Sequence, residues 1–159
     1  MRLLLIKLLL ISSLLTFLFF PVCAAKTVTL PGLEQPNLIA VDDGQLYVAE
    51  KTSIRIFSLK DFKPVKTFGR EGEGPQEFRR MIQQVYPLDK DLFINSSGRI
   101  SYFTKNGAFI KETRLPDPRI RVQPLGGKFL VRGATIENDI LYVTENIYDK
   151  SLAKIKEVH

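Results

Sequence analysis

A stretch of 19 residues that occurs twice decides the fold of this chain. Residues 39–57, IAVDDGQLYVAEKTSIRIF, align without a gap on residues 85–103, VYPLDKDLFINSSGRISYF, at a spacing of 46. Each copy alternates short apolar runs with turn residues, which indicates β-strands. A fainter third copy follows 37 residues later, where residues 129–131 match residues 92–94. The chain therefore contains an internal repeat made of strands.

This repeat predicts a partial β-propeller. Each unit has room for about four short antiparallel strands, which is the content of one propeller blade of about 40–45 residues. A single blade cannot bury both of its faces, so neighbouring blades must pack against it. We therefore expect an all-β fold of about three four-stranded antiparallel blades, at approximately 36–78, 79–116 and 117–159. The alternative is an ordinary meander or sandwich whose strands share a spacing by chance.

Three local patterns add detail to this fold. Asn106-Gly107 stands between two short apolar runs and predicts a hairpin with a type I′ turn, in which both turn residues have positive φ. Residues Ser151–Val158 fit a helix face or a strand, and their place in the third unit favours a strand. Thr27–Leu30 resembles an outer strand that has no preceding hairpin partner.

Residues 1–25 are typical of an export signal. Two basic residues precede an apolar run, and Cys-Ala-Ala at 23–25 offers small residues for cleavage. The run is shorter than the roughly 20 apolar residues that a spanning helix needs. We expect an exported protein, periplasmic or extracellular, with a retained membrane anchor over Leu3–Val22 as the alternative. A lipid anchor on Cys23 fits less well, because Phe-Pro-Val at 20–22 is bulky where lipoprotein signals carry small residues.

Composition excludes several kinds of site. Among 159 residues there is one Cys, and the single His is His159, so a disulfide framework, a zinc ribbon and a His-based triad are all excluded. The net charge is +6, and it falls to +4 once the signal and its two basic residues are removed. Because the basic residues are spread singly, with Arg79-Arg80 as the only adjacent pair, and because an exported protein does not meet nucleic acid, we expect no nucleic-acid partner.

The acidic pairs of the sequence do not predict a catalytic or metal site. General acid–base chemistry needs two carboxyls in unlike environments within one cleft. Two pairs occupy equivalent turns, where Asp bonds its own backbone, and the third lacks the spacing of an EF-hand. The three pairs are Asp42/Asp43, Asp89/Asp91 and Glu71/Glu73. We therefore expect no bound metal and no cofactor.

The first repeat carries a family resemblance. Residues 36–50, PNLIAVDDGQLYVAE, resemble the opening of an NHL repeat, and residues 54–58, IRIFS, resemble its third strand. Residues 68–78, FGREGEGPQEF, are similar to the glycine-rich link that leads to the next NHL blade. The departures from the family pattern are Leu38, Glu50 and Thr52. The resemblance implies a six-bladed propeller of a kind common among exported bacterial proteins.

The glycine-rich link is predicted to be a structural turn between blades. Gly69, Gly72 and Gly74 allow positive φ, and Pro75 stiffens the exit. A phosphate cradle is disfavoured, because no Lys-Ser/Thr pair follows the glycines and the link itself is acidic. Buried aromatic rings are expected between the blades, at Tyr47, Phe57, Phe68, Phe93, Tyr102, Phe103 and Phe109.

The binding residues predicted from the sequence are Arg70, Arg79 and Arg80, which flank the glycine-rich link. Four further arginines are interpreted as a solvated surface, namely Arg99, Arg119, Arg121 and Arg132. These assignments favour an exported module that binds or scaffolds a protein or a cell-envelope ligand. One alternative is a fragment of a propeller enzyme, a lyase or lactonase, whose active site needs further blades. Another is the extracytoplasmic sensor part of an anchored receptor.

The predicted blade number also bears on assembly. A six-bladed ring needs about 250 residues at this repeat length. Three blades predict either a truncated product, which the sequence favours, or a half-ring completed by a second copy. Unpaired strand edges at the ends of such an array would invite self-association.

Overall fold

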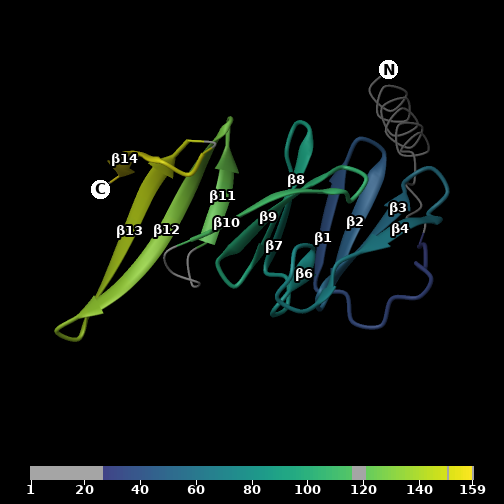
Figure 1. The fold of residues 1–159 in the computed structure, drawn as a ribbon, viewed down its shortest axis with the longest axis horizontal. Helices are drawn as coiled ribbons and strands as arrows, with labels where there is room; N and C mark the ends of the chain where they lie inside the picture. The colour runs from purple at the N-terminus through teal and green to yellow at the C-terminus, as the bar shows by residue number, and fades with distance from the viewer. Residues whose placement is uncertain (1–26, 116–120, 150, 159) are drawn as a thin grey trace, which may run out of the picture.

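The computed structural model describes residues 27–115, 121–149 and 151–158, so the predicted signal over residues 1–25 lies outside the described residues. Within these ranges every regular element is a strand. No helix of the described residues is long and apolar enough to cross a membrane. Three four-stranded sheets follow one another along the long axis of the molecule (Figure 1).

Each sheet is an antiparallel meander in which strands adjacent in sequence pair with one another. Blade 1 contains β1 (Leu38–Asp42), β2 (Gln45–Glu50), β3 (Ser53–Ser58) and β4 (Pro64–Phe68). Blade 2 contains β7 (Gln84–Pro87), β8 (Asp91–Ser96), β9 (Arg99–Thr104) and β10 (Phe109–Arg114). Blade 3 contains β11 (Arg121–Leu125), β12 (Lys128–Glu137), β13 (Ile140–Tyr148) and β14 (Lys154–Val158).

The strand positions reproduce the sequence repeat. The bounds of β2 and β3 recur 46 residues later in β8 and β9, and β7 and β8 begin 37 residues before β11 and β12. The strand predicted within residues 151–158 is present as β14. The predicted all-β fold with three four-stranded antiparallel blades is confirmed, and the meanders pack as successive units rather than as the two layers of a sandwich.

The core lies between the blades. Because successive side chains of a strand point to opposite faces, the central blade is buried on both sides. In β8, Leu92 and Ile94 pack toward blade 1, whereas Phe93 packs toward blade 3. The ring of Phe93 lies 5.2 Å from that of Phe129 in blade 3. Burial of each such side chain contributes about 1.5–3 kcal/mol, so these contacts hold the blades in a row.

The predicted aromatic core is confirmed, with one difference of position. Six of the seven aromatic residues are buried and Phe109 is partly buried. Phe68 of β4 and Phe103 of β9 join blades 1 and 2, with ring centroids 4.8 Å apart. Phe57 instead faces away from blade 2, where it packs with Leu46 and Val48.

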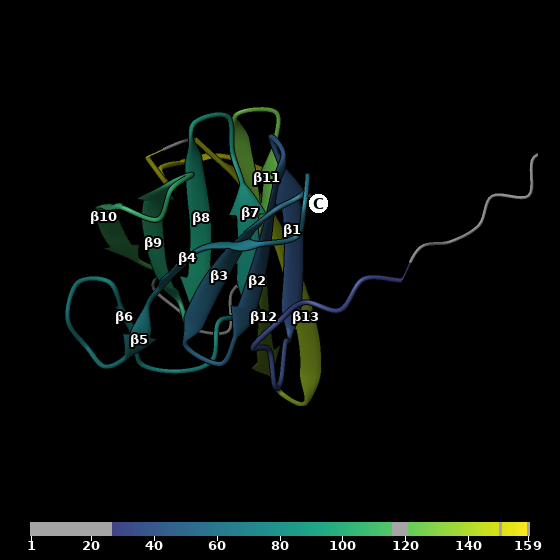
Figure 2. The same ribbon diagram turned by 90° about the vertical axis from the view of Figure 1, so that its right-hand side faces the viewer.

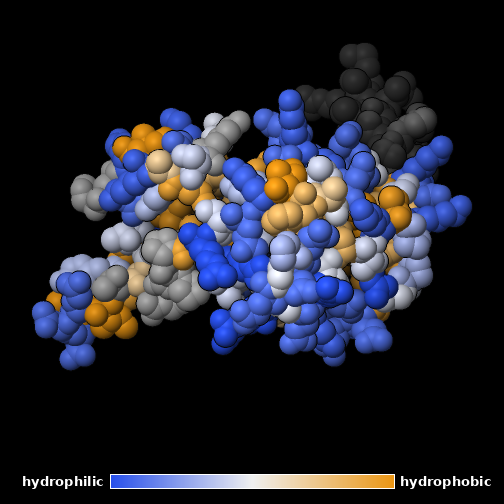
Figure 3. Space-filling view, in the orientation of Figure 1, coloured by the Kyte–Doolittle hydropathy of each residue, from blue (hydrophilic) through white to orange (hydrophobic). Residues whose placement is uncertain are grey.

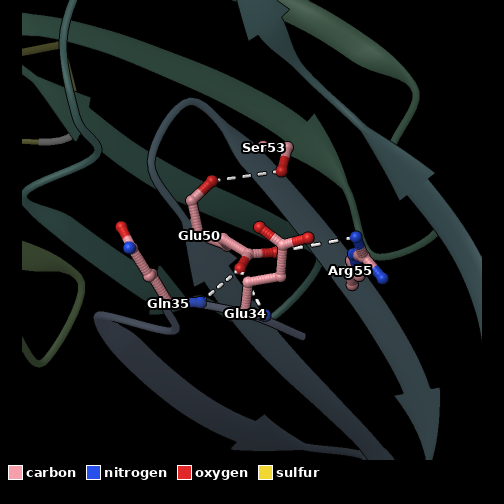
Figure 4. A network of polar contacts seen from close by, with 5 residues as sticks. All are labelled: Glu34, Gln35, Glu50, Ser53 and Arg55. Atoms are coloured by element: carbon pink, nitrogen blue, oxygen red, sulfur yellow. Dashed lines mark hydrogen bonds and ion pairs between the residues drawn. The ribbon is translucent and has the colours of Figure 1, made fainter. Parts of the chain in front are cut away.

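A strap of irregular chain covers that outer face of blade 1. The prediction of a strand over Thr27–Leu30 is wrong, because this segment forms no strand. Its Leu30, together with Leu33 further along the strap, packs on the apolar face instead. The carboxylate of Glu50 accepts hydrogen bonds from the backbone N–H groups of Glu34 (2.7 Å) and Gln35 (2.5 Å) (Figure 4). These two N–H groups are the main reason that the pKa of Glu50 lies below its ordinary value.

The predicted hairpin at Asn106-Gly107 is confirmed, but its predicted turn type is wrong. Only Gly107 has positive φ, at +71°, and the N–H of Gly107 donates to the carbonyl of Thr104 (2.8 Å). Thr104 in turn bonds Ala108, so the loop has three residues. Such loops join a type I turn to one left-handed residue, for which glycine is preferred.

Blade 3 extends beyond the other two. Its β12–β13 hairpin projects from the row of sheets, and hydrophobic residues gather at its free end (Figures 1 and 3). Ile136, Leu141 and Val143 share one face of this hairpin and are between 58% and 71% exposed. In the sheet-stacking pattern of blades 1 and 2 this is the face that a neighbouring blade would cover.

Candidate binding site

The link between blades 1 and 2 carries the site. After β4 the chain forms two very short parallel strands, β5 (Arg70–Glu71) and β6 (Glu77–Phe78), at the end of the sheets where it crosses to blade 2 (Figure 2). The carboxylate of Glu77 ties this link together, because it accepts a hydrogen bond from the N–H of Gly74 (2.8 Å) and pairs with Arg70. The N–H of Gly74 and then the Arg70 guanidinium hold the pKa of Glu77 below its ordinary value.

The glycines of the link are required for two different reasons. Gly69 has φ of +82°, and a Cβ there would lie 2.6 Å from the ring of Phe78. Gly72 has φ of +153°, and a Cβ there would collide with the carboxylate of Glu77. Gly74 does not adopt the positive φ that glycine allows. A Cβ at Gly74 would lie 3.0 Å from the carboxylate of Glu77, so the small size of this glycine is what matters. Pro75 lies exposed between the two short strands.

The three arginines predicted to bind a ligand separate in the structure. Arg70 is 80% exposed on its side chain and pairs with Glu77, with an Nη2–Oε1 distance of 2.6 Å. Arg79 and Arg80 instead line a pocket of about 340 Å³ together with Glu73 of the link. The pocket therefore contains two of the three predicted binding residues, and Arg70 is outside it.

Blade 2 supplies the remaining walls of the pocket. The β8–β9 turn contributes Ser96–Arg99, and the end of β10 contributes Arg114 and Leu115. The turn residues Ser97 and Gly98 both have positive φ, 53° and 76°, as a type I′ turn requires. These blade 2 residues were not predicted as part of a site.

Arg99 does not lie on the solvated surface that the sequence predicts for it. Its side chain is only 11% exposed, and its Nε lies 2.6 Å from the carboxylate of Glu112. Its Nη2 also donates to the carbonyl of Gly74 (2.7 Å), which joins blade 2 to the link. Arg99 is therefore a largely buried charge, fixed in place by two contacts, in the lining of the pocket.

Arg79 is held more loosely. Its Nε lies 3.1 Å from the carboxylate of Glu73, and the two side chains are 70% and 68% exposed. Exposed ion pairs of this kind contribute about 0–1 kcal/mol, because water and salt screen them. Separating Arg79 from Glu73 to bind a ligand therefore costs little free energy.

The lining of the pocket is suited to binding rather than to proton transfer. It presents four arginines and the single carboxylate of Glu73. Among residues 27–115, 121–149 and 151–158, no three His, Cys, Asp or Glu side chains are grouped to hold a metal ion. The acidic Asp42 lies at the opposite end of blade 1, as the last residue of β1, where it pairs with Lys105. Guanidinium groups bind carboxylates and phosphates, so the pocket is arranged for an anion.

The sheets and their packing define the class of the protein as a β-propeller, of which the described chain holds three blades. A Bacteroides fragilis protein described as a candidate exported protein is similar in fold, with a TM-score of 0.65 and 17% identity over 84% of this chain and 40% of that one. The WD40 domain of Neurospora crassa Pan2 is also similar, with a TM-score of 0.53 and 19% identity over 78% of this chain and 38% of that one.

No family model and no curated protein matches the sequence. At 17% and 19% identity the two solved structures show the propeller fold alone, and they do not single out the NHL family. The chain spans about two fifths of the length of either structure.

Proposed function

We propose that this chain is part of an exported NHL-type β-propeller that acts as a binding module for a protein or another cell-envelope ligand. The observation that carries the proposal is the arginine-lined pocket, which loops build on a stack of rigid blades. Binding sites are commonly placed on loops that a rigid scaffold positions. The NHL resemblance extends the proposal to a six-bladed ring, and the signal-like residues 1–25 extend it to a periplasmic or extracellular location.

The anchoring of the link supports this role. Phe78 and Ile82 are 1% and 0% exposed, and the N–H of Ile82 donates to the carbonyl of Lys51 in blade 1 (2.8 Å). The N–H of Gln83 donates to the carbonyl of Asn95 in blade 2 (2.8 Å). The link is therefore fixed to both blades, so that a ligand meets a preformed surface and little conformational entropy is lost on binding.

The proposal is tested by capturing ligands from cell-envelope extract on the immobilised protein. Arg80→Glu is the informative variant, because Arg80 lines the pocket and has no ion pair among the described residues. Lys66→Glu, on the exposed surface of β4, makes the same charge change outside the pocket. We expect Arg80→Glu to lose a partner that the wild type and Lys66→Glu both retain. Equal capture by all three proteins would remove the pocket from the function.

Two further measurements test the rest of the proposal. Turnover of a lactone or a polysaccharide that a chelator abolishes would replace the binding role with an enzymatic one. N-terminal sequencing of the mature protein together with cell fractionation tests the location: a protein that begins at Lys26 and remains soluble supports export with cleavage, and a membrane-bound chain that retains residues 1–25 supports the anchor.

A further inference from the structure

Two of the four pocket arginines lack a carboxylate partner. Arg79 pairs with Glu73, and Arg99 pairs with Glu112. In the part of the chain that the structure describes, Arg80 and Arg114 form no ion pair. Two guanidinium groups that line one pocket and lack counter-charges produce a positive potential there, which a bound anion would relieve.

The register of the β9–β10 hairpin places a second positive charge beside the uncompensated Arg114. Arg114 lies directly opposite Arg99 in the antiparallel pair, so the two side chains share one face of the sheet. Like charges in that arrangement destabilise a hairpin. Glu112 is two residues before Arg114 on the same face, and it compensates Arg99 at 2.6 Å. One positive charge at this position is therefore left without a partner.

The backbone on each side of the pocket is fixed. The hydroxyl of Ser96 donates to the carbonyl of Arg80 (2.7 Å), and Ser96 is 2% exposed. The N–H of Leu115 donates to the carbonyl of Gly98 (2.7 Å), which holds the residue after Arg114 against the β8–β9 turn. Both unpaired arginines thus start from anchored backbone positions, so that the order needed for binding is largely present before the ligand arrives.

The N–H groups of the turn are already occupied. Ser97 donates to the side chain of Gln83 (3.1 Å), and Gly98 donates to the side chain of Asn95 (3.1 Å). The charged donors in the lining are the guanidinium groups, whose planar forks match the two oxygens of a carboxylate or a phosphate. The pocket volume of about 340 Å³ is at the lower end of the range for small-molecule sites, which is about 300–1,000 Å³.

We infer that this pocket binds an oxyanion group of the ligand, a phosphate or a carboxylate, and that Arg80 and Arg114 hold its oxygens. The largely buried Arg99 adds a fixed positive charge to the lining, and Leu115 supplies an apolar wall for the uncharged part of the ligand. This inference rests on the proposed binding function, for which it names the chemical class of the group recognised.

The test is isothermal titration calorimetry of the purified protein with three probes: inorganic phosphate, glucuronate and glucose. Glucuronate and glucose differ by one carboxylate, so glucose is the matched neutral probe. We expect at least one anion to bind, more tightly at 20 mM than at 200 mM NaCl, and glucose not to bind. Binding of phosphate alone assigns the site to a phosphate group, and binding of glucuronate assigns it to a carboxylate. Absence of binding by both anions overturns the inference.

Variants locate the bound anion. Arg80→Gln and Arg114→Gln should each raise the dissociation constant by about tenfold or more, because each removes a charge-assisted hydrogen bond. Lys66→Gln loses a charge outside the pocket and should bind as the wild type does. Arg114→Lys keeps the charge without the fork, so it should bind with intermediate strength if the fold is intact by circular dichroism. Unchanged affinity in the double variant Arg80→Gln/Arg114→Gln overturns the inference.

The outcome is separable from that of the proposed function. Anion binding that depends on Arg80, without capture of any envelope partner, supports the site and contradicts the binding role. Envelope capture that depends on Arg80, without binding of phosphate or glucuronate, supports the role and contradicts the oxyanion site.

Discussion

Substitution of Gly107 by alanine tests the packing between blades 1 and 2. Gly107 lies in the β9–β10 loop of blade 2, and a Cβ there would lie 2.5 Å from Cδ1 of Phe68 in blade 1. Phe68 cannot easily move away, because it is only 8% exposed and its ring lies 4.8 Å from that of Phe103. The substitution therefore forces a new methyl group against the core between the blades.

The expected magnitude has two parts. Gly107 has φ of +71°, and an alanine in the left-handed region costs about 1–2 kcal/mol. Overpacking a well-filled core adds about 1–3 kcal/mol. Gly44 is the matched control, because its φ is +72° and a Cβ there would meet nothing within 4 Å. Gly107→Ala should therefore lower the free energy of unfolding by about 1–3 kcal/mol more than Gly44→Ala.

Urea denaturation followed by circular dichroism measures this difference, provided that the slope of the free energy against urea is the same in both variants. Equal destabilisation by the two substitutions would mean that only the turn is strained. The packing of the β9–β10 loop on Phe68 would then be refuted.

Two further substitutions test other contacts of the fold. Phe93→Ala should lower the free energy of unfolding by about 3–5 kcal/mol, because it leaves a cavity in the core where Phe93 packs on Phe129. A loss below about 1 kcal/mol in urea denaturation would contradict the packing of blade 2 on blade 3 through these rings. Glu50→Gln should destabilise the protein at pH 7, where the ionised carboxylate accepts hydrogen bonds from Gln35 and Glu34. Because the folded pKa of Glu50 lies below its ordinary value of 4.5, the advantage of the wild type should shrink as the pH falls below that value. A difference in melting temperature that stays constant from pH 7 to pH 3 would contradict this assignment.

The strand pattern could be predicted because burial on a sheet imposes a period of two and the repeat imposes a spacing. If Asn106-Gly107 is taken as a two-residue hairpin turn, pairing the residues of the two strands outward from it places Arg99 opposite Arg114. This is the observed register. The three-residue loop shifts this register by one, and the irregularity between Phe109 and Lys111 restores it. The pair of opposed arginines could therefore have been found from the hairpin signal alone.

The rest of the site depends on contacts that the sequence pattern does not contain. The course of the link follows from the burial of Ile82 and from the hydrogen bond between Ser96 and the carbonyl of Arg80. These tertiary contacts bring Arg80 to the pocket, whereas Arg70 is turned toward Glu77 within the link. The irregular conformation of Thr27–Leu30 also depends on a tertiary contact. The alternation of its side chains fits a strand, but Leu30 docks on blade 1 in place of a strand partner.

The central claim is that the pocket between the link and blade 2 binds an oxyanion. The most direct measurement is a crystal structure of the protein grown with the anion that binds most tightly in the titrations. We predict electron density for that anion between the guanidinium groups of Arg80 and Arg114, with the Arg99–Glu112 ion pair intact. Density for the anion at another place, with only water in this pocket, would contradict the claim.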